Sequence, residues 1–230
     1  PPYIGSKYLN TQLRDLAKSQ FPKSKSDLYS MAVERFARYV KSTGICGFMT
    51  PFTWMFLSSF EDFREIIHGE NTLLSLIQPQ YHTFFESAAV PICAFLIQGA
   101  STKDYQATFI KLTEFRGAEL QAPKALEAIS HRGCPWRFEA KPDDFSLIPG
   151  KPIAYWIPTR TIRSFAEMKS VGSVAEAKQG LITGDNGRFL RLWHEVSRGN
   201  IRFDSKGRSD AKASQVKWFP FQKGGEFRKW

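Results

Sequence analysis

The sequence predicts an α/β fold, and three observations support this prediction. Segments with apolar residues at helical spacing alternate with short continuous apolar runs, as expected for helices packed on a buried sheet. Apolar residues make up 42% and aromatic residues 14% of the 230 residues, which is enough to form a hydrophobic core. Glycines and prolines separate the patterned segments and mark the turns between them.

The first part of the chain carries two predicted helices and one strand. Residues 13–18 form a short helical pattern, and a longer one covers residues 28–40. Ser26-Asp27 can cap the first turn of the longer helix, and Gly44 is predicted to end it. The apolar run at residues 44–50 is predicted to be a buried parallel strand.

A third helix and two further strands are predicted next. Residues 54–67 carry a broad apolar stripe at helical spacing. Residues 73–77 and 90–97 are short apolar runs typical of strands. This order of helix and buried strand is the pattern that predicts the α/β class.

The pattern of apolar residues changes over residues 101–150. Residues 109–112 are predicted to be a strand and residues 123–130 a helix, but prolines interrupt the sequence that follows. We therefore predict a first domain over residues 1–118 and a connector over 119–150. A second domain is predicted over 151–230.

Strand-like or mixed patterns are expected within this second domain. They lie at residues 171–181, 189–196 and 201–203. We therefore expect this part of the chain to have a mixed α+β fold.

The net charge of +10 is concentrated in the last third of the chain. Residues 1–100 carry nine basic and eight acidic residues, and residues 101–150 carry seven of each. Residues 151–230 carry sixteen basic residues against seven acidic ones, interleaved with aromatic residues. This mixture is typical of a surface that binds nucleic-acid phosphates, although a solvated basic surface without a partner has the same composition.

The cysteines, the histidines and the hydropathy bear on the cell compartment, on metal binding and on membrane insertion or secretion. Three cysteines (Cys46, Cys93 and Cys134) suit a reducing cytoplasm. The pair His131 and Cys134 offers too few ligands for a zinc site, so no metal is expected. Neither a membrane span nor a signal peptide is expected.

The chain begins with Pro1-Pro2-Tyr3, a tripeptide with a rigid backbone and an aromatic end. The two prolines hold φ near −65°, so the turn is stiff and the Pro1 carbonyl is a fixed acceptor. Tyr3 offers a flat face on which an extruded base can stack. The same tripeptide also occurs in disordered tails and in ligands of WW domains.

Longer segments give this tripeptide a family context. Residues 1–10 resemble the adenine-binding motif of N6-adenine DNA methyltransferases, usually written Asn-Pro-Pro-Tyr. Together with further segments, nearly the whole chain resembles the PglX-type methyltransferases of bacteriophage-exclusion systems. These segments are GICGFMTP at 44–51, WMFLSS at 54–59, GLITGDN at 180–186, RFLR at 188–191, KWFPF at 217–221 and GGEFRKW at 224–230. The family's leading Asn would immediately precede Pro1, so the chain is expected to be a fragment of a larger enzyme.

The resemblance implies a fold, a reaction and a set of residues. Residues 1–118 would be the C-terminal part of a Rossmann-like methyltransferase sheet, ending in an antiparallel pair of strands. The reaction would transfer a methyl group from S-adenosylmethionine to N6 of a flipped adenine. The Pro1 carbonyl would accept a hydrogen bond from the adenine amine, and Tyr3 would stack on the base. Phe85, favoured over Phe84, would close its other side, although both could equally anchor the strands.

The cofactor site is expected upstream of Pro1. Methyltransferases hold S-adenosylmethionine with a glycine-rich turn after a strand, by the same logic as other nucleotide-binding folds. No such turn is visible in this sequence. The segment 184–187 is a tight turn by composition rather than a phosphate cradle.

The basic last third resembles the start of the family's target-recognition domain. Its candidate contacts to the backbone of double-stranded DNA are Arg188, Arg191, Lys217, Lys223 and Arg228. Asp185 and Asn186 are read as a hairpin turn in preference to a direct DNA contact.

Other functions fit part of the same sequence. The chain could belong to a combined restriction–modification enzyme, or it could be a non-catalytic DNA-binding module derived from such an enzyme. Methylation of RNA or protein is a third class. Phage-defence proteins are expected as further partners, and the cytoplasm as the location.

Overall fold

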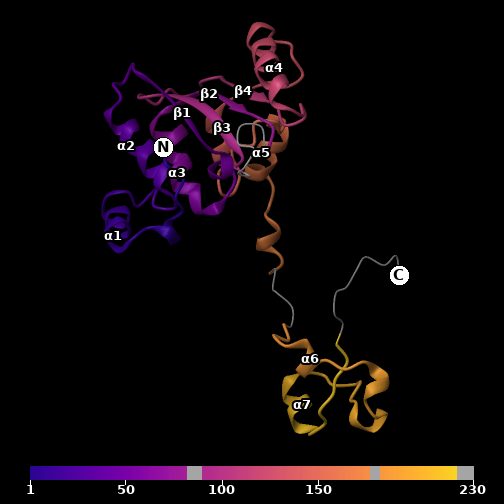
Figure 1. Cartoon of the computed structure of the whole chain (residues 1–230). Coiled ribbons are helices and arrows are strands. Elements are labelled where there is room, and N and C mark those ends of the chain that lie inside the picture. Colours follow the sequence, from indigo (N-terminus) through magenta and orange to yellow (C-terminus); the bar gives the residue numbers. More distant parts are fainter. Residues whose placement is uncertain (82–89, 177–181, 222–230) are drawn as a thin grey trace. The chain divides into compact units, whose positions relative to one another are not determined.

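The chain forms two compact units in a computed structural model (Figure 1). The structure describes residues 1–81, 90–176 and 182–221. The first unit covers Pro1–Val174 and the second covers Ala175–Trp230. None of the described helices is long and apolar enough to cross a membrane.

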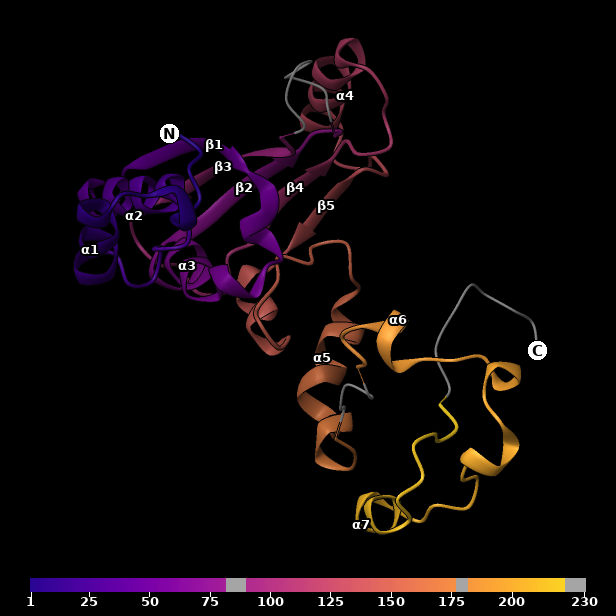
Figure 2. The ribbon, with the colours of Figure 1, turned by 60° about the horizontal axis from the view of Figure 1, so that its bottom comes forward.

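A five-stranded mixed sheet is the frame of the first unit (Figure 2). The strand order is β1-β3-β2-β4-β5. β3 is antiparallel to both β1 and β2, β2 is parallel to β4, and β5 is antiparallel to β4. The carboxyl ends of β1, β2 and β4 therefore lie at one edge of the sheet. The strands are β1 (Ile45–Pro51), β2 (Thr72–Gln78), β3 (Ile92–Gln98), β4 (Ala107–Lys111) and β5 (Arg137–Ala140).

The described helices of both units have at most 13 residues. The first unit holds α1 (Thr11–Gln20), α2 (Leu28–Tyr39), α3 (Glu61–Glu65), α4 (Ala118–Ser130) and α5 (Thr159–Glu167). The second holds α6 (Asn186–Phe189) and α7 (Arg208–Ala213). Short 3₁₀ turns and one π-helical turn, Ile66–Glu70, connect several of them.

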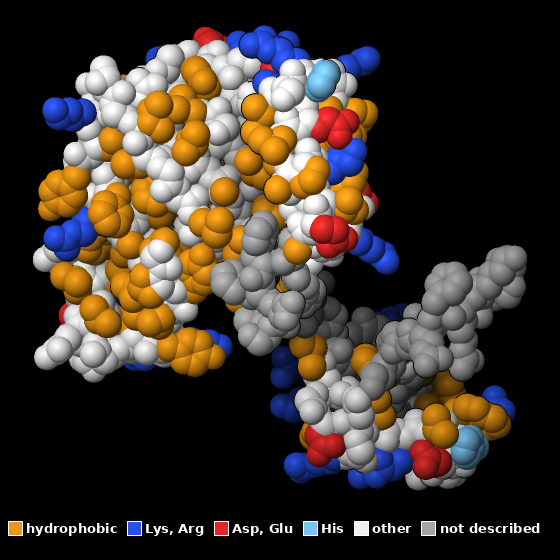
Figure 3. Space-filling model, turned by 45° about the horizontal axis from the view of Figure 1, so that its top comes forward, with side chains coloured by type: hydrophobic (Ala, Val, Ile, Leu, Met, Phe, Trp, Pro, Cys, Tyr) orange, Lys and Arg blue, Asp and Glu red, His pale blue; other side chains and the backbone are white. Residues whose placement is uncertain are grey.

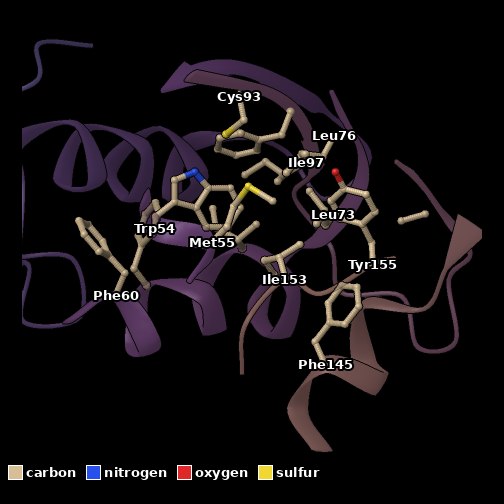
Figure 4. Packing of buried hydrophobic residues seen from close by; sticks show 14 of the residues in the cluster. Trp54, Met55, Phe60, Leu73, Leu76, Cys93, Ile97, Phe145, Ile153 and Tyr155 are labelled. Carbon is tan, nitrogen blue, oxygen red and sulfur yellow. The ribbon is translucent and has the colours of Figure 1, made fainter. Parts of the chain in front are cut away.

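The main hydrophobic core lies on one face of the sheet (Figure 4). Trp54 is fully buried there and contacts Phe63 edge-on and Phe95 at a tilt, with ring centroids 5.8 and 5.0 Å apart. The segment after Gly150 adds Ile153 and Tyr155 to the same cluster. On the opposite face, α4 packs over β4 through Ala128, Ile110 and Leu112. Helices thus cover both faces of the sheet, and the predicted α/β class is confirmed.

The antiparallel pair that the resemblance implied is present, whereas the orientation predicted for β1 is wrong. β2 and β3 form the antiparallel pair. β1 is antiparallel to its neighbour β3 and alternates between more and less exposed residues instead of being buried throughout. Ile45 and Met49 of β1, with Leu96 of β3, are exposed on the face away from the main core. A short apolar run has the same sequence pattern in either setting.

Gly44 does not end α2. The helix ends at Tyr39, and Val40 is already extended. Gly44 instead closes a turn in which its amide donates to the Lys41 carbonyl at 2.8 Å. A Cβ at Gly44 would lie 2.9 Å from the Val40 side chain, so close chain approach explains this glycine.

The predicted helix at residues 54–67 is broken into short pieces. 3₁₀ turns cover Phe52–Met55 and Ser58–Phe60 before α3 begins. Leu57 is extended between them, so within the described residues the Trp54 carbonyl has no backbone donor. The buried Arg64 side chain donates to this carbonyl at 2.6 Å, and at 2.8 Å to the carbonyl of Leu57, which also accepts from the Phe60 amide. At Trp54 a tertiary hydrogen bond thus replaces the helical one.

The predicted domain boundaries at 118 and 150 differ from the boundary between the two units. Within the predicted connector, β5 pairs with β4, and Phe145 and Ile148 are buried in the main core. Apolar burial therefore carries the first unit through to Val174. Scattered prolines interrupt this segment, but they do not prevent it from packing.

The strand-like patterns expected beyond residue 170 do not form strands in the described residues. Val171–Ser173 and Trp193–Glu195 are 3₁₀ turns. In the described part of the second unit, the β-structure is one isolated bridge, between Ile201 and Trp218. Residues 177–181 lie outside the described residues.

Candidate functional site

The Pro1-Pro2-Tyr3 turn lies beside the carboxyl end of β1. The Tyr3 hydroxyl donates a hydrogen bond to the Met49 carbonyl at 3.1 Å. The Tyr3 ring meets the buried Tyr29 ring edge-on, with centroids 6.0 Å apart and planes at 89°. Tyr3 as a residue is nevertheless 36% exposed. Its ring is therefore anchored at one end and accessible, at the sheet edge where open α/β folds place their ligands.

The hydroxyls of Tyr3 and Tyr29 are neutral near pH 7, as is a tyrosine with its ordinary pKa of about 10. Partial burial raises the pKa of Tyr3, and deeper burial raises the pKa of Tyr29 further. Tyr3 thus remains a hydrogen-bond donor to Met49 at neutral pH. A hydroxyl with a raised pKa does not serve as a base near pH 7.

The nearby thiol is also unreactive. Cys93 is fully buried on β3, and burial raises its pKa to about 12. Its sulfur lies 3.7 Å from the Thr50 hydroxyl. Because a thiolate is needed for nucleophilic attack, Cys93 is a core residue.

The other groups predicted to bind the base are the Pro1 carbonyl and the phenylalanines at 84 and 85. Pro1 and Pro2 are exposed, and within the described residues no hydrogen bond occupies the Pro1 carbonyl. Phe84 and Phe85 belong to the segment between β2 and β3, and they lie outside the described residues.

Sequence reasoning missed one residue at this turn, Asp27. One oxygen of its carboxylate accepts hydrogen bonds from the Ile4 amide at 3.0 Å and from the Tyr29 amide at 3.1 Å. Its role as the cap of α2 could be read from the sequence. Its bond to the residue after Tyr3 could not, because nothing in the local pattern links positions 23 residues apart.

The segment around Asp185 is a helix start. The Asp185 side chain caps α6 by accepting from the Arg188 amide at 3.0 Å, and Gly184 has a φ of +69°. The prediction of a hairpin turn is therefore wrong. The Asp185 side chain satisfies the Arg188 amide, which has no partner within the helix. This cap favours a helix over a hairpin turn at this position.

Three of the predicted DNA contacts lie in the described part of the second unit. Arg188 lies over the Phe189 ring at 5.1 Å, and Lys217 lies over the Trp218 ring at 5.3 Å. Arg191 donates to the carbonyls of Gly187 and Leu190, both at 2.6 Å. Lys223 and Arg228 lie outside the described residues.

The same unit contains an aromatic hollow of about 570 Å³. Phe189, Trp193, Phe203 and Trp218 contribute to its lining, and Arg191 lies among them. The interleaving of basic and aromatic residues that the sequence suggested is therefore present in space. Figure 3 shows Lys and Arg side chains along the lower surface of this unit.

Among the described residues, no group of three or more His, Cys, Asp or Glu side chains is placed to hold a metal ion. Cys134 is buried in the small cluster under α4, and His131 is exposed at the end of that helix.

Comparison with known proteins places this site in a family context. Residues 1–85 match the family model of the Eco57I restriction-modification methylases. This range includes the Pro1-Pro2-Tyr3 turn, Asp27, β1 and β2. The chain is also 31% identical over 233 residues to adenine-specific methyltransferase PglX of Lacticaseibacillus casei (strain Zhang), and this match covers all of the chain.

The chain resembles PglX-type adenine-specific methyltransferases along its whole length. A second such relative, adenine-specific methyltransferase BrxX of Escherichia coli O9:H4 (strain HS), is 34% identical over 234 residues and again covers the whole chain. The chain spans only 19% of the length of PglX and 18% of that of BrxX.

A solved structure supports the fold. The type IIG restriction endonuclease BpuSI matches 68% of this chain and 20% of its own, with a TM-score of 0.50 and 13% sequence identity. At this sequence identity the similarity supports the fold alone. That fold is shared with an enzyme of a restriction system.

Proposed function

We propose that this chain supplies the base-binding part of an enzyme that transfers a methyl group from S-adenosylmethionine to N6 of adenine in DNA. The anchored, accessible Tyr3 ring is the observation that carries this proposal. It lies at the carboxyl end of β1, in the segment that matches a methylase family and with the tripeptide of an adenine-binding motif.

Methyl transfer to the adenine amine depends more on the orientation of the reactants than on acid or base groups. The adenine amine is a weak nucleophile because its lone pair is delocalised into the ring. A carbonyl that accepts from this amine favours the nucleophilic, tetrahedral form, and positioning against the methyl donor supplies much of the rate. We assign the Pro1 carbonyl to the first task and Tyr3 to holding the flipped base.

A glycine-rich turn between a strand and a helix is the element that usually holds the nucleotide part of such a cofactor. Among the described residues, no strand is followed by such a turn. When bound, the cofactor would supply the methyl group. We propose that its site lies in the additional length that the relatives have.

We expect Tyr3→Ala in the full-length protein to reduce the rate of adenine methylation about 5- to 100-fold, since stacking on an aromatic ring is worth about 1–3 kcal/mol per base. Affinity for S-adenosylmethionine should stay the same. Single-turnover methylation of duplex DNA and calorimetry of cofactor binding measure the two effects.

Tyr3→Phe is the matched control. It keeps the ring and removes only the hydrogen bond to Met49. Its rate should lie close to that of the wild type. Equal rates for all three proteins would remove Tyr3 from the base-binding site. Phe85→Ala should behave as Tyr3→Ala does if Phe85 is the second platform.

We further propose that the second unit contacts the DNA backbone. Its described residues carry eight Lys and Arg against five Asp and Glu, and the cations lie beside aromatic rings. Arg188 and Lys217 are the candidates whose side-chain nitrogens are not committed to a hydrogen bond in the described structure. Arg191 holds the end of α6 through its two carbonyl contacts.

Each of Arg188→Glu and Lys217→Glu should weaken DNA binding at all sequences and make it less dependent on salt. Each phosphate contact contributes a slope of about −0.9 in log K against log salt concentration. Lys103→Glu makes the same charge change at an exposed position of the first unit and should leave the slope unchanged. A constant slope with relaxed preference at one base pair would instead make the residue a base reader.

The family resemblance also suggests the cell compartment and the partner proteins of the enzyme. We propose that it acts in the cytoplasm, in phage defence or restriction–modification, together with other proteins of such a system. Co-purification from infected cells, with an untagged strain as control, tests the last point.

A further inference from the structure

Two backbone–backbone hydrogen bonds and one bond to a side chain join the residues after Tyr3 to the start of α2. The Leu28 amide donates to the Ile4 carbonyl at 2.9 Å, and the Ser6 amide donates to the Ser26 carbonyl at 3.0 Å. The Asp27 carboxylate accepts from the Ile4 amide at 3.0 Å. Gly5 and Asp27 thus form a short antiparallel bridge. Of these three bonds, only the one to Asp27 uses a side chain, so only it can be removed by substitution.

Asp27 connects this bridge to the ring that Tyr3 meets. The oxygen that accepts from Ile4 also accepts from the Tyr29 amide. The Tyr29 ring is 1% exposed and is held by Phe60, stacked at 5.8 Å, and by Phe63, edge-on at 6.4 Å. One carboxylate oxygen therefore ties the backbone next to Tyr3 to the backbone of the residue that supports the Tyr3 ring.

We propose that Asp27 is a positioning residue for the target base: it fixes the direction in which Tyr3 presents its ring. The proposal rests on the function proposed above. Tyr3 is the last residue of the turn, and its own contacts are one hydrogen bond at its hydroxyl and one edge-on ring contact. Neither contact fixes the backbone. The hydrogen bond from Ile4 to Asp27 does so one residue further on, and a small displacement of a stacking ring is enough to reduce the rate of a reaction that depends on orientation.

The chain offers a matched control, because Asn10 caps α1 in the same way. Its side chain accepts from the Leu13 amide at 2.9 Å. Loss of either cap destabilises one helix by a similar amount. Only loss of Asp27 also releases Ile4. Asp27→Asn serves as the conservative variant, since an amide oxygen can accept from both backbone amides.

The experiment compares Asp27→Ala, Asp27→Asn and Asn10→Ala in the full-length protein, with two readouts. The first is hydrogen–deuterium exchange by mass spectrometry, which needs no activity. Asp27→Ala should accelerate exchange in a peptide covering residues 1–8, Asn10→Ala should accelerate it only around residues 10–20, and Asp27→Asn should do neither.

The second readout is steady-state methylation of DNA. Asp27→Ala should lower kcat about 5- to 10-fold, a part of what stacking itself contributes, with little change in affinity for S-adenosylmethionine. Asp27→Asn should restore kcat, and Asn10→Ala should keep it within about twofold. Unchanged exchange at residues 1–8, or equal losses of kcat in the two alanine variants, would overturn the proposal. If the wild type methylates no adenine, the proposed function fails, and the exchange readout still tests the link between Asp27 and the turn.

Discussion

Replacing Arg64 with methionine should lower the free energy of unfolding of the chain by about 3–5 kcal/mol. Arg64 is fully buried, and its guanidinium donates to the carbonyls of Trp54, Leu57 and Gly150. Methionine fills a similar volume, but within the described residues it leaves the carbonyls of Trp54 and Gly150 without a donor, whereas that of Leu57 keeps the Phe60 amide. The Gly150 contact also holds the start of the segment that adds Ile153 and Tyr155 to the main core. Urea unfolding followed by circular dichroism measures the change.

Two further variants test this explanation. Arg64→Lys keeps the charge but cannot reach all three carbonyls in the same geometry, so its loss should be intermediate. Arg116→Met makes the same exchange at an exposed position and should change stability by no more than about 0.5 kcal/mol. A loss for Arg64→Met as small as that for Arg116→Met would show that the buried guanidinium is not needed.

The first unit should lose about 3 kcal/mol of stability between pH 6.5 and pH 4 because of His68 alone. His68 is 5% exposed beside Phe145, and within the described residues its Nε2 atom has no hydrogen-bond partner. Burial is the main cause that lowers its pKa from 6.5 to about 4, with Lys151 and Arg64 adding to the effect against Asp143. The folded state therefore keeps His68 neutral, while the unfolded chain takes up a proton.

The sign of this effect follows from proton binding. Stability is lost as the pH falls from 6.5 to about 4, because over this range the unfolded state binds one proton more than the folded state. In His68→Leu this part of the pH dependence should disappear. His131→Gln changes an exposed histidine and should keep the wild-type profile. Parallel profiles for the wild type and His68→Leu would contradict the assignment.

How far the sequence predicted the fold depended on whether local signals agreed with tertiary contacts. The helix that became α2 was located closely because its cap, Asp27, and its apolar spacing lie next to each other. The predicted helix at residues 54–67 was wrong because Arg64 satisfies the backbone where the helix breaks. The direction of β1 depends on which strand lies beside it, and its own residues do not encode that partner.

The candidate site shows the same division. Tyr3 could be named from a three-residue motif. Asp27 could be read only as a helix cap, because its bond to Ile4 exists only once the chain has folded back. Arg191 is a residue type that often contacts phosphates, so the sequence suggested a DNA contact. In the structure its guanidinium donates to the carbonyls of Gly187 and Leu190, which the sequence pattern does not reveal.

We propose that the Pro1-Pro2-Tyr3 turn holds an adenine for methylation at N6. The most direct measurement is mass spectrometry of the nucleosides released from DNA after incubation with the full-length protein and S-adenosylmethionine carrying a heavy methyl group. We expect heavy N6-methyl-2′-deoxyadenosine from the wild type, and a strongly reduced yield from Tyr3→Ala at equal cofactor occupancy. A heavy methyl group found only on cytosine, or N6-methyl-2′-deoxyadenosine formed equally well by Tyr3→Ala, would contradict this function.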